Sequence, residues 1–533
     1  MLKRGGAWAW LVVLAFGAVY AASLTFVYIE GDDARSIAYH AYGRDASAIG
    51  PYAAYQAGMD ALLRWLPPSE PVLRVTAMSA TAAAGALMAV LLLAVAFGWV
   101  GDLTGREKLA AAGATLLAMP ELFYLSLVYQ PPLVGMCCAL GAHLTLWRAL
   151  REGSRRWWAV SCALFAAAGV FRWNLLLYGW VVAADLLFRS EEDRRAREAL
   201  LARWLATSLG LWALGSAALG AGWSDVVAFV RLAETGASAE RGWMTAVAWH
   251  QPLLTPGLLA LGVIGWRALR SMDTGAARAA VFGAAPLLFL LPTENPKQEL
   301  PFLAPVVALA ACGAVRCLRG GGWRIATVSA VLLLPWVVGF RVVSPETGWG
   351  GSFAVPDYRT PPATRWSVRV AWWSGGAVAT QEGPRGLWGN GHALLGGGWR
   401  GLVTEAARER QRAWRLAAEE KLPVVLLGIA PHYMAAEMAG TGFARSADLV
   451  RHLSDEILTV RLKDGHAVRA ISLWRGNRSW VSDDAAPLRT ATRGQDFVAV
   501  GLARPMRAMA ALPGLELRAL GPRSALGRWH PDK

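Results

Sequence analysis

Long apolar segments separated by short polar connections occupy the first 340 residues of the chain. A helix needs roughly 20 apolar residues to cross the hydrocarbon core of a bilayer. Eleven segments have this character, several of them shorter: Ala7–Ile29, Val75–Val100, Leu109–Tyr129, Leu133–Trp147, Trp157–Phe171, Asn174–Phe188, Trp204–Gly222, Leu253–Trp266, Ala279–Leu291, Leu300–Val315 and Ile325–Phe340. The pattern predicts a polytopic α-helical membrane protein with about eleven transmembrane helices. The first segment is too long for a signal-peptide core, so we expect it to remain as an anchor.

Arginine is concentrated in every second connection between these segments. Because cytoplasmic loops collect Lys and Arg, this alternation places the N-terminus in the cytoplasm. The basic connections contain Arg106 and Lys108; Arg148, Arg151, Arg155 and Arg156; Arg189, Arg194, Arg195, Arg197 and Arg203; Arg267, Arg270 and Arg278; and Arg316, Arg319 and Arg324. The intervening connections are longer but poorer in basic residues. We therefore predict a multi-pass protein of the inner, cytoplasmic membrane, with a turn at Arg172-Trp173-Asn174 and everything after Phe340 outside.

The last third of the chain has the composition of a soluble domain. Gly and Pro interrupt it, and a charged stretch at Glu405–Lys421 predicts a helix followed by a short buried strand at Pro423–Ile429. Further strands are expected at Ile457–Leu462, Ala470–Trp474 and Phe497–Leu502. These patterns predict two domains: a transmembrane domain at residues 1–340, with an outer loop at 30–74, and a C-terminal extracytoplasmic α/β domain at residues 341–533.

Composition supports the membrane class. Hydrophobic residues make up 55% of the chain, charged residues only 17%, and the mean hydropathy is +0.34, which excludes an ordinary soluble protein. A net charge of +15 is also found in nucleic-acid-binding proteins, but cytoplasmic loops of membrane proteins routinely collect Lys and Arg, so we expect membrane lipids as partners and no nucleic acid. The five cysteines lie in or beside apolar segments without metal-ligand spacing, which indicates packing residues.

Two adjacent acids, Asp32 and Asp33, follow the first apolar segment directly. Carboxylates at a membrane face are costly to place. One of them can deprotonate an acceptor hydroxyl, or both can hold a divalent metal ion. Alternatively, one of them caps an amphipathic helix, where an acidic first turn is favoured by the helix dipole.

A second polar cluster, Thr293–Glu299, forms a tight turn between two apolar segments on the outer side. Lys297 is the only lysine between Lys108 and Lys421, and an ammonium at this level can pair with a lipid phosphate. The alternative is a charged turn in which Lys297 is solvated or paired with Glu294.

Two further candidates lie on the outer side. Arg172 is at the tip of the pair of short segments, where snorkelling into the interface is the alternative explanation. His250 ends the aromatic outer loop Trp223–Gln251, where it is either a functional base or a structural residue.

The order of these features resembles the GT-C superfamily of membrane glycosyltransferases, and most closely the branch of the aminoarabinose lipid A transferase and the protein O-mannosyltransferases. Three segments carry the resemblance: Gly31-Asp32-Asp33-Ala34 with Ile37-Ala38-Tyr39, Gly169–Trp173, and Glu294–Pro305, which is similar to the His/Asn-Pro-Arg-Tyr-like turn of the family. The architecture matches over residues 1–340. Gln298 departs from the family pattern, because an aromatic residue is common there.

The resemblance implies an inverting glycosyltransferase that moves a sugar from a polyprenyl-phosphate-linked donor to a lipid, glycan or protein acceptor at the outer face of the membrane. The role of base or metal ligand then falls on Asp32 or Asp33, and the donor phosphate on Lys297. Arg172, Glu294 and His250 are further candidates for binding substrate or lipid phosphate. Two alternatives remain: a transporter or flippase of lipid or polysaccharide, and a non-catalytic scaffold that presents the external domain.

Overall fold

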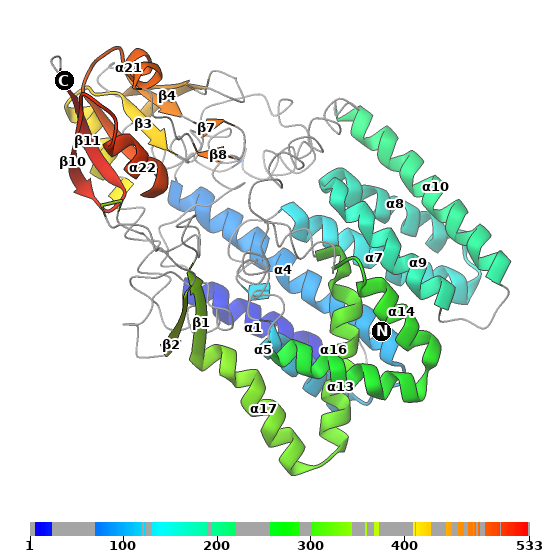
Figure 1. Cartoon of the computed structure of the whole chain (residues 1–533). Helices are drawn as coiled ribbons and strands as arrows, with labels where there is room; N and C mark the ends of the chain where they lie inside the picture. Colours follow the sequence, from blue (N-terminus) through cyan, green and yellow to red (C-terminus); the bar gives the residue numbers. More distant parts are fainter. Residues whose placement is uncertain are drawn as a thin grey trace.

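The computed structural model describes the chain in segments: residues 6–23, 65, 70–119, 122–123, 131–188, 194–219, 256–287, 300–343, 358–359, 367–372, 409–410, 412–427, 444–449, 457–462, 467–472, 474–475, 478–479, 485–501 and 503–530. Every structural statement below concerns these residues. Their apolar part is helical, and their C-terminal part contains a β-sheet (Figure 1).

Each predicted apolar segment coincides with a helix. The helices are α1 (Ala7–Ser23), α4 (Glu70–Val100), α5 (Gly105–Ala118), α7 (Pro131–Glu152), α8 (Arg155–Phe171), α9 (Tyr178–Phe188), α10 (Arg194–Ala218), α13 (Pro256–Met272), α14 (Thr274–Ala284), α16 (Leu303–Arg319) and α17 (Gly322–Val337). Short 3-10 helices precede α9 and α16: η3 (Trp173–Leu177) and η5 (Leu300–Phe302). The segment predicted to start at Asn174 is therefore two elements rather than one regular helix.

Three stretches of the described helices are long and apolar enough to cross a membrane: Ser79–Val100, Leu133–Glu152 and Leu300–Arg319. Ala7–Ala21, Trp173–Phe188 and Arg324–Leu333 are shorter apolar helices. The polytopic helical membrane class expected from the sequence is thus confirmed. The number of eleven spans stays a prediction.

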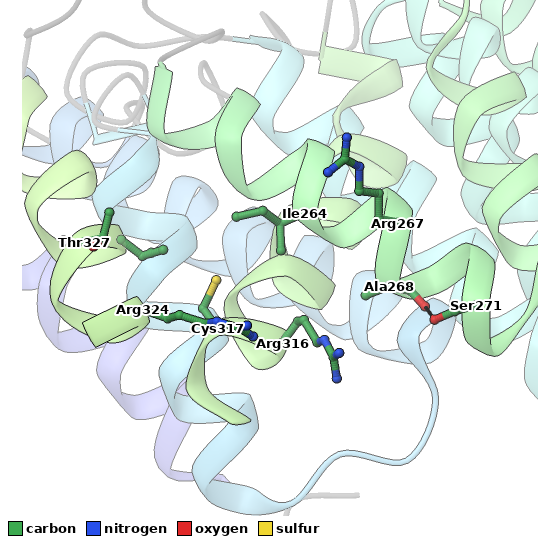
Figure 2. Close-up of a pocket in the computed structure, with 9 residues that line it drawn as sticks. Ile264, Arg267, Ala268, Ser271, Arg316, Cys317, Arg324 and Thr327 are labelled. Atoms are coloured by element: carbon green, nitrogen blue, oxygen red, sulfur yellow. Dashed lines mark hydrogen bonds between the residues drawn. The ribbon is translucent and has the colours of Figure 1, made fainter. Parts of the chain in front are cut away.

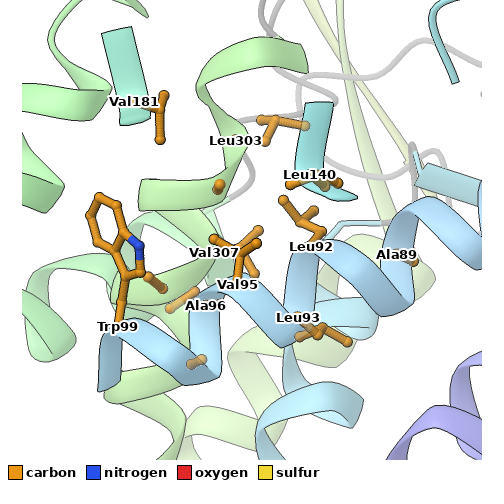
Figure 3. Packing of buried hydrophobic residues seen from close by; sticks show 14 of the residues in the cluster. Ala89, Leu92, Leu93, Val95, Ala96, Trp99, Leu140, Val181, Leu303 and Val307 are labelled. Carbon is orange, nitrogen blue, oxygen red and sulfur yellow. The ribbon is translucent and has the colours of Figure 1, made fainter. Parts of the chain in front are cut away.

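The helical core is centred on α4. Leu92, Val95 and Trp99 are each no more than 2% exposed, and they pack against buried residues of α7, α9 and α16 (Figure 3). The labelled partners in that view are Leu140, Val181, Leu303 and Val307. One continuous apolar cluster therefore joins helices from α1 to α17.

α13 and α16 approach each other more closely than side chains normally allow. A Cβ atom at Gly265 would collide with the Leu309 carbonyl group, and one at Gly313 would collide with that of Leu261. Small residues permit such backbone contact between membrane helices, where van der Waals packing drives association. The two glycines hold this helix pair together.

The basic connections lie at one end of the helical domain. The Arg319 Nε atom donates to Glu107 Oε1 at 2.6 Å, which joins the end of α16 to the start of α5. At the same end, Gly275 of α14 lies against the Phe188 carbonyl at the end of α9, and Trp147 of α7 lies against Gly98 near the end of α4. This grouping agrees with the arginine alternation in the sequence.

The C-terminal part forms a seven-stranded mixed sheet in the order β10-β11-β9-β3-β6-β5-β4. Its strands are β3 (Val424–Leu427), β4 (Ala444–Leu449), β5 (Ile457–Leu462), β6 (Ala467–Ser472), β9 (Phe497–Gly501), β10 (Leu515–Gly521) and β11 (Ser524–Trp529). β3 pairs in parallel with β6 and β9, and the other pairs are antiparallel. Buried residues of the sheet pack with α21 (Ala486–Thr492) and α22 (Ala503–Ala510). The expected α/β character is confirmed.

Between the helices and this sheet, β1 (Val338–Val343) pairs with β2 (Ser367–Trp372) in an antiparallel ladder. α17 runs directly into β1, so the helix ends at Val337 and not at Phe340 as expected. β1 crosses the boundary predicted after residue 340, and the division into two domains stays a prediction.

Candidate functional site

The connection between α8 and α9 forms a compact polar turn. Arg172 adopts an extended conformation (φ −164°, ψ 122°) that ends α8, and its backbone N–H donates to the Ala168 carbonyl at 3.0 Å. The Leu175 N–H donates to the Arg172 carbonyl at 3.0 Å and starts η3. The turn predicted at Arg172-Trp173-Asn174 is therefore present.

Arg172 is 5% exposed, although it lies in a turn. Its buried Nε atom has no hydrogen-bond partner in the described part of the chain. A snorkelling arginine keeps its guanidinium in the polar interface, so the enclosure of Arg172 by protein argues against that explanation. The Nε–H of a buried cation that lacks a partner among the described residues is costly to leave unsatisfied, and an anionic ligand is the kind of group that would satisfy it.

Asn174 adds polar capacity to the same turn. Both its carboxamide nitrogen and its carboxamide oxygen are buried without a partner among the described residues. The Trp212 Nε1 atom of α10 is in the same situation, and the Trp212 ring lies against Gly169, one helical turn before Arg172. Buried polar groups are normally paired, so several orphaned groups around one turn indicate a place for a ligand or ordered water.

Neighbouring helices hold the turn in place. Gly135 of α7 lies so close to Leu175 and Phe171 that a Cβ atom there would be 3.1 Å from Phe171 Cβ. η5 contacts η3 directly, and Leu300 and Phe302 of η5 are nearly fully buried. η5 begins at Leu300, three residues after Lys297 in the sequence.

The other predicted site residues lie outside the described residues: Asp32, Asp33, His250, Glu294 and Lys297. Of the residues expected to bind substrate, the structure therefore places only Arg172. The described residues contain no group of three His, Cys, Asp or Glu side chains that could hold a metal ion. A divalent metal at Asp32 and Asp33 stays a prediction.

Sequence reasoning missed a buried polar cluster between α7 and α9. His143 is 0% exposed; its Nδ1 atom lies 2.9 Å from the Tyr178 hydroxyl, and its Nε2 atom lies 3.0 Å from Asp185 Oδ2. The Trp147 Nε1–H donates to the same Asp185 oxygen at 2.5 Å. Ionisable residues inside apolar segments are expensive, and that signal was available at His143 and Asp185. Their hydrogen bonds connect α7 to α9 and indicate a structural role.

The cysteines behave as expected from their surroundings. All five are free, and Cys162, Cys312 and Cys317 are buried. Their packing role agrees with the absence of metal-ligand spacing in the sequence.

Comparisons with known proteins show which solved structures have a similar fold. No protein-family model matches the chain, and no curated protein matches it. The crystal structure of ArnT from Cupriavidus metallidurans bound to undecaprenyl phosphate is similar, with a TM-score of 0.54 at 17% identity. The apo structure of the same ArnT gives a TM-score of 0.52 at 16% identity, and both matches cover 98% of each chain. The chain therefore has the fold of these ArnT structures over nearly its whole length, and the predicted resemblance to GT-C membrane glycosyltransferases is confirmed at the level of the fold.

Proposed function

We propose that the chain is an inverting glycosyltransferase that uses a polyprenyl-phosphate-linked sugar donor at the outer face of the inner membrane. The observation that carries the proposal is the fold match over 98% of both chains to a protein crystallised with undecaprenyl phosphate. The buried Arg172 at the α8–α9 turn supports it independently, because its Nε atom has no partner among the described residues and a lipid phosphate is the kind of anion that a guanidinium binds.

In this proposal Arg172 holds the donor phosphate. A guanidinium offers planar paired donors that match phosphate oxygens, and the buried Asn174 amide adds a further donor beside it. Lys297 precedes η5, which packs on the turn, and we assign it a second phosphate contact. Glu294 and His250 are assigned to substrate binding near these groups.

The acid role falls on Asp33 as general base, with Asp32 in support. The base takes the proton of the acceptor hydroxyl, whose oxygen attacks the anomeric carbon of the sugar. The bond from that carbon to the phosphate oxygen breaks on the opposite face, and polyprenyl phosphate leaves with the electron pair. A single displacement of this kind inverts the anomeric configuration. Alternatively, the two acids hold a divalent metal ion that activates the hydroxyl.

The charge balance gives Arg172 a role beyond donor binding. The donor is a phosphodiester with one negative charge, and the leaving polyprenyl phosphate carries a second. A cation beside the phosphate therefore interacts more strongly in the transition state than in the ground state, which accelerates the reaction.

The orientation follows from the distribution of charge. Because the basic connections share one end of the helical domain, we assign that end to the cytoplasm, together with the N-terminus. The α8–α9 turn and the C-terminal sheet then belong to the outer side. A polyprenyl donor in the bilayer meets an acceptor from outside at this level.

The experiment is a transfer assay with the purified chain in nanodiscs. A polyprenyl-phosphate-linked sugar and a mixture of lipid, glycan and protein acceptors are supplied, and polyprenyl phosphate release is followed with and without EDTA. Acceptor-dependent release with an inverted anomeric centre is the expected result. Movement of the intact donor across the bilayer without cleavage would instead identify a flippase. If neither transfer nor movement is observed, the non-catalytic scaffold is favoured.

A further inference from the structure

A cavity of about 400 Å³ lies at the basic end of the helical domain, between α13, α16 and α17. Each helix contributes one arginine to its lining: Arg267, Arg316 and Arg324 (Figure 2). Figure 2 shows Arg316 and Arg324 beside Cys317, with Arg267 across from them on α13. The cavity and the α8–α9 turn lie at opposite ends of the helical domain, because the connections after α13 and α16 are at the basic end.

Among the described residues that line this cavity there is no carboxylate. In the described part of the chain, Arg267 and Arg316 form no ion pair, and both side chains are exposed. Two described acids in the connections at this end are already engaged: Glu107 binds Arg319, and Asp273 Oδ1 accepts from the Ala276 N–H at 2.9 Å to cap α14. Arg267 and Arg316 are like charges on the lining of one cavity, so they repel each other, and a bound anion relieves that repulsion.

The lining of the cavity changes along the helices from arginine side chains at the helix ends to apolar side chains further along. On α13, which runs towards the basic end, Ile264 precedes Arg267 by one turn. On α17, which runs away from that end, Val328 follows Arg324 by one turn. The apolar residues therefore lie deeper than the arginines. Val263 and Leu259 of α13 are 55% and 53% exposed, so an apolar surface continues from the cavity along the helix.

We propose that this cavity binds an anionic phospholipid of the leaflet at the basic end of the bundle. The phosphate lies at Arg267, Arg316 and Arg324, and an acyl chain follows Ile264 and Val328. Basic cavities between membrane helices bind such headgroups. A free phosphate would make no favourable contact with the apolar residues Ile264 and Val328, whereas an acyl chain would. The lipid would connect α17, which leads into β1, to the tightly packed α13–α16 pair. This site is independent of the proposed sugar transfer.

The test measures lipid binding to the full chain by native mass spectrometry and by melting in neutral detergent. Phosphatidylglycerol, phosphatidylcholine and inorganic phosphate are added separately. Wild-type protein should bind phosphatidylglycerol about tenfold more tightly than phosphatidylcholine and melt higher with it. Arg267→Gln/Arg316→Gln should lose that preference. Arg278→Gln, which removes an exposed arginine of α14 outside the cavity, should keep it.

Two outcomes would overturn the proposal. One is an unchanged phosphatidylglycerol preference in the double variant. The other is stabilisation by inorganic phosphate alone that equals the effect of phosphatidylglycerol, because the site would then bind a free anion. If the double variant fails to fold, Arg267→Lys/Arg316→Lys keeps the charge and should retain the preference, while Ile264→Asn should weaken lipid binding without changing the charge.

Discussion

Glu107 and Arg319 join two helix ends that are 212 positions apart in the sequence, through a hydrogen bond of 2.6 Å from the Arg319 Nε atom. The same carboxylate accepts at 2.9 Å from both the backbone N–H and the hydroxyl of Thr104, while the Glu107 N–H donates back to the Thr104 hydroxyl at 3.3 Å. Glu107 thus completes the capping box of α5 and an ion pair to α16 at once.

The stability of the chain should fall in acid because of this carboxylate. The Arg319 hydrogen bond, followed by that from the Thr104 backbone, lowers the pKa of Glu107 from 4.5 to about 2. A lowered pKa means that its stabilisation is complete above pH 4.5 and is lost as the pH falls towards 2. Glu107→Gln should reduce stability at pH 7 by about 1–2 kcal/mol and flatten this acid limb. Melting curves at several pH values measure both effects.

A matched control is the exposed pair Arg148–Glu152, whose atoms are 2.7 Å apart on the surface of α7. Glu152→Gln should change stability by only about 0.3–0.5 kcal/mol, since solvent screens such pairs. Equal effects of the two substitutions would show that Glu107 does not connect the helix ends.

Arg172→Gln should separate activity from stability. Removal of a buried cation whose Nε atom has no partner among the described residues should leave the melting temperature equal or higher, whereas loss of a charged phosphate contact should lower kcat/KM by about 10- to 100-fold. Part of that loss should appear in kcat, because the leaving phosphate gains charge. Arg172→Lys should recover part of the activity. A variant that melts lower and transfers normally would make Arg172 a structural residue.

The first-loop acids can be tested one at a time. Asn preserves the size and hydrogen bonding of Asp but removes its charge, so a capping residue tolerates it. Asp33→Asn should lower turnover by about 10²- to 10⁴-fold, with a smaller loss for Asp32→Asn. Turnover of folded variants from a polyprenyl-phosphate donor is the measurement. Wild-type rates in both would make the acids structural.

Lys297 should contribute charge rather than shape to donor binding. Lys297→Ala should raise the donor KM, while Lys297→Arg should retain most of the affinity, because either cation can pair with a phosphate. Small and equal effects of the two changes would favour a solvated charged turn. Donor titrations of the two variants distinguish these results.

The topology predicts opposite compartments for two reporter fusions. A reporter fused after Val343, where β1 ends, should be active only in its extracytoplasmic form. A fusion after Gly321, between α16 and α17, should be active only in its cytoplasmic form. Cytoplasmic activity after Val343 would contradict an odd number of spans and an outer site.

Hydropathy predicted the helices well because each apolar segment must bury its length in the bilayer or in the bundle. The turn at Arg172-Trp173-Asn174 was predicted, but the 3-10 helix at Trp173–Leu177 was not, because Leu175–Leu177 are as apolar as a regular helix. This short helix packs against Gly135 and η5. β5 was predicted at its observed bounds, whereas β10 and β11 were missed because arginine and glycine interrupt their alternation.

The candidate site was predictable only in part. Arginine at a turn identified Arg172, but its burial is a property of the tertiary structure, which no local sequence pattern reveals. The His143–Asp185 contact joins positions 42 residues apart, and it could likewise not be predicted from the pattern of either segment alone.

The position of β3 in the sheet determines when the C-terminal domain can finish folding. β3 is synthesised first, yet both of its neighbours, β6 and β9, come later, and β9 begins only at Phe497. Pairings of such long sequence separation form slowly. During synthesis one edge of β3 stays open until β9 has emerged. A chain truncated before Phe497 keeps that edge open, and an unpaired edge promotes aggregation. β9 therefore protects the central strand of this sheet.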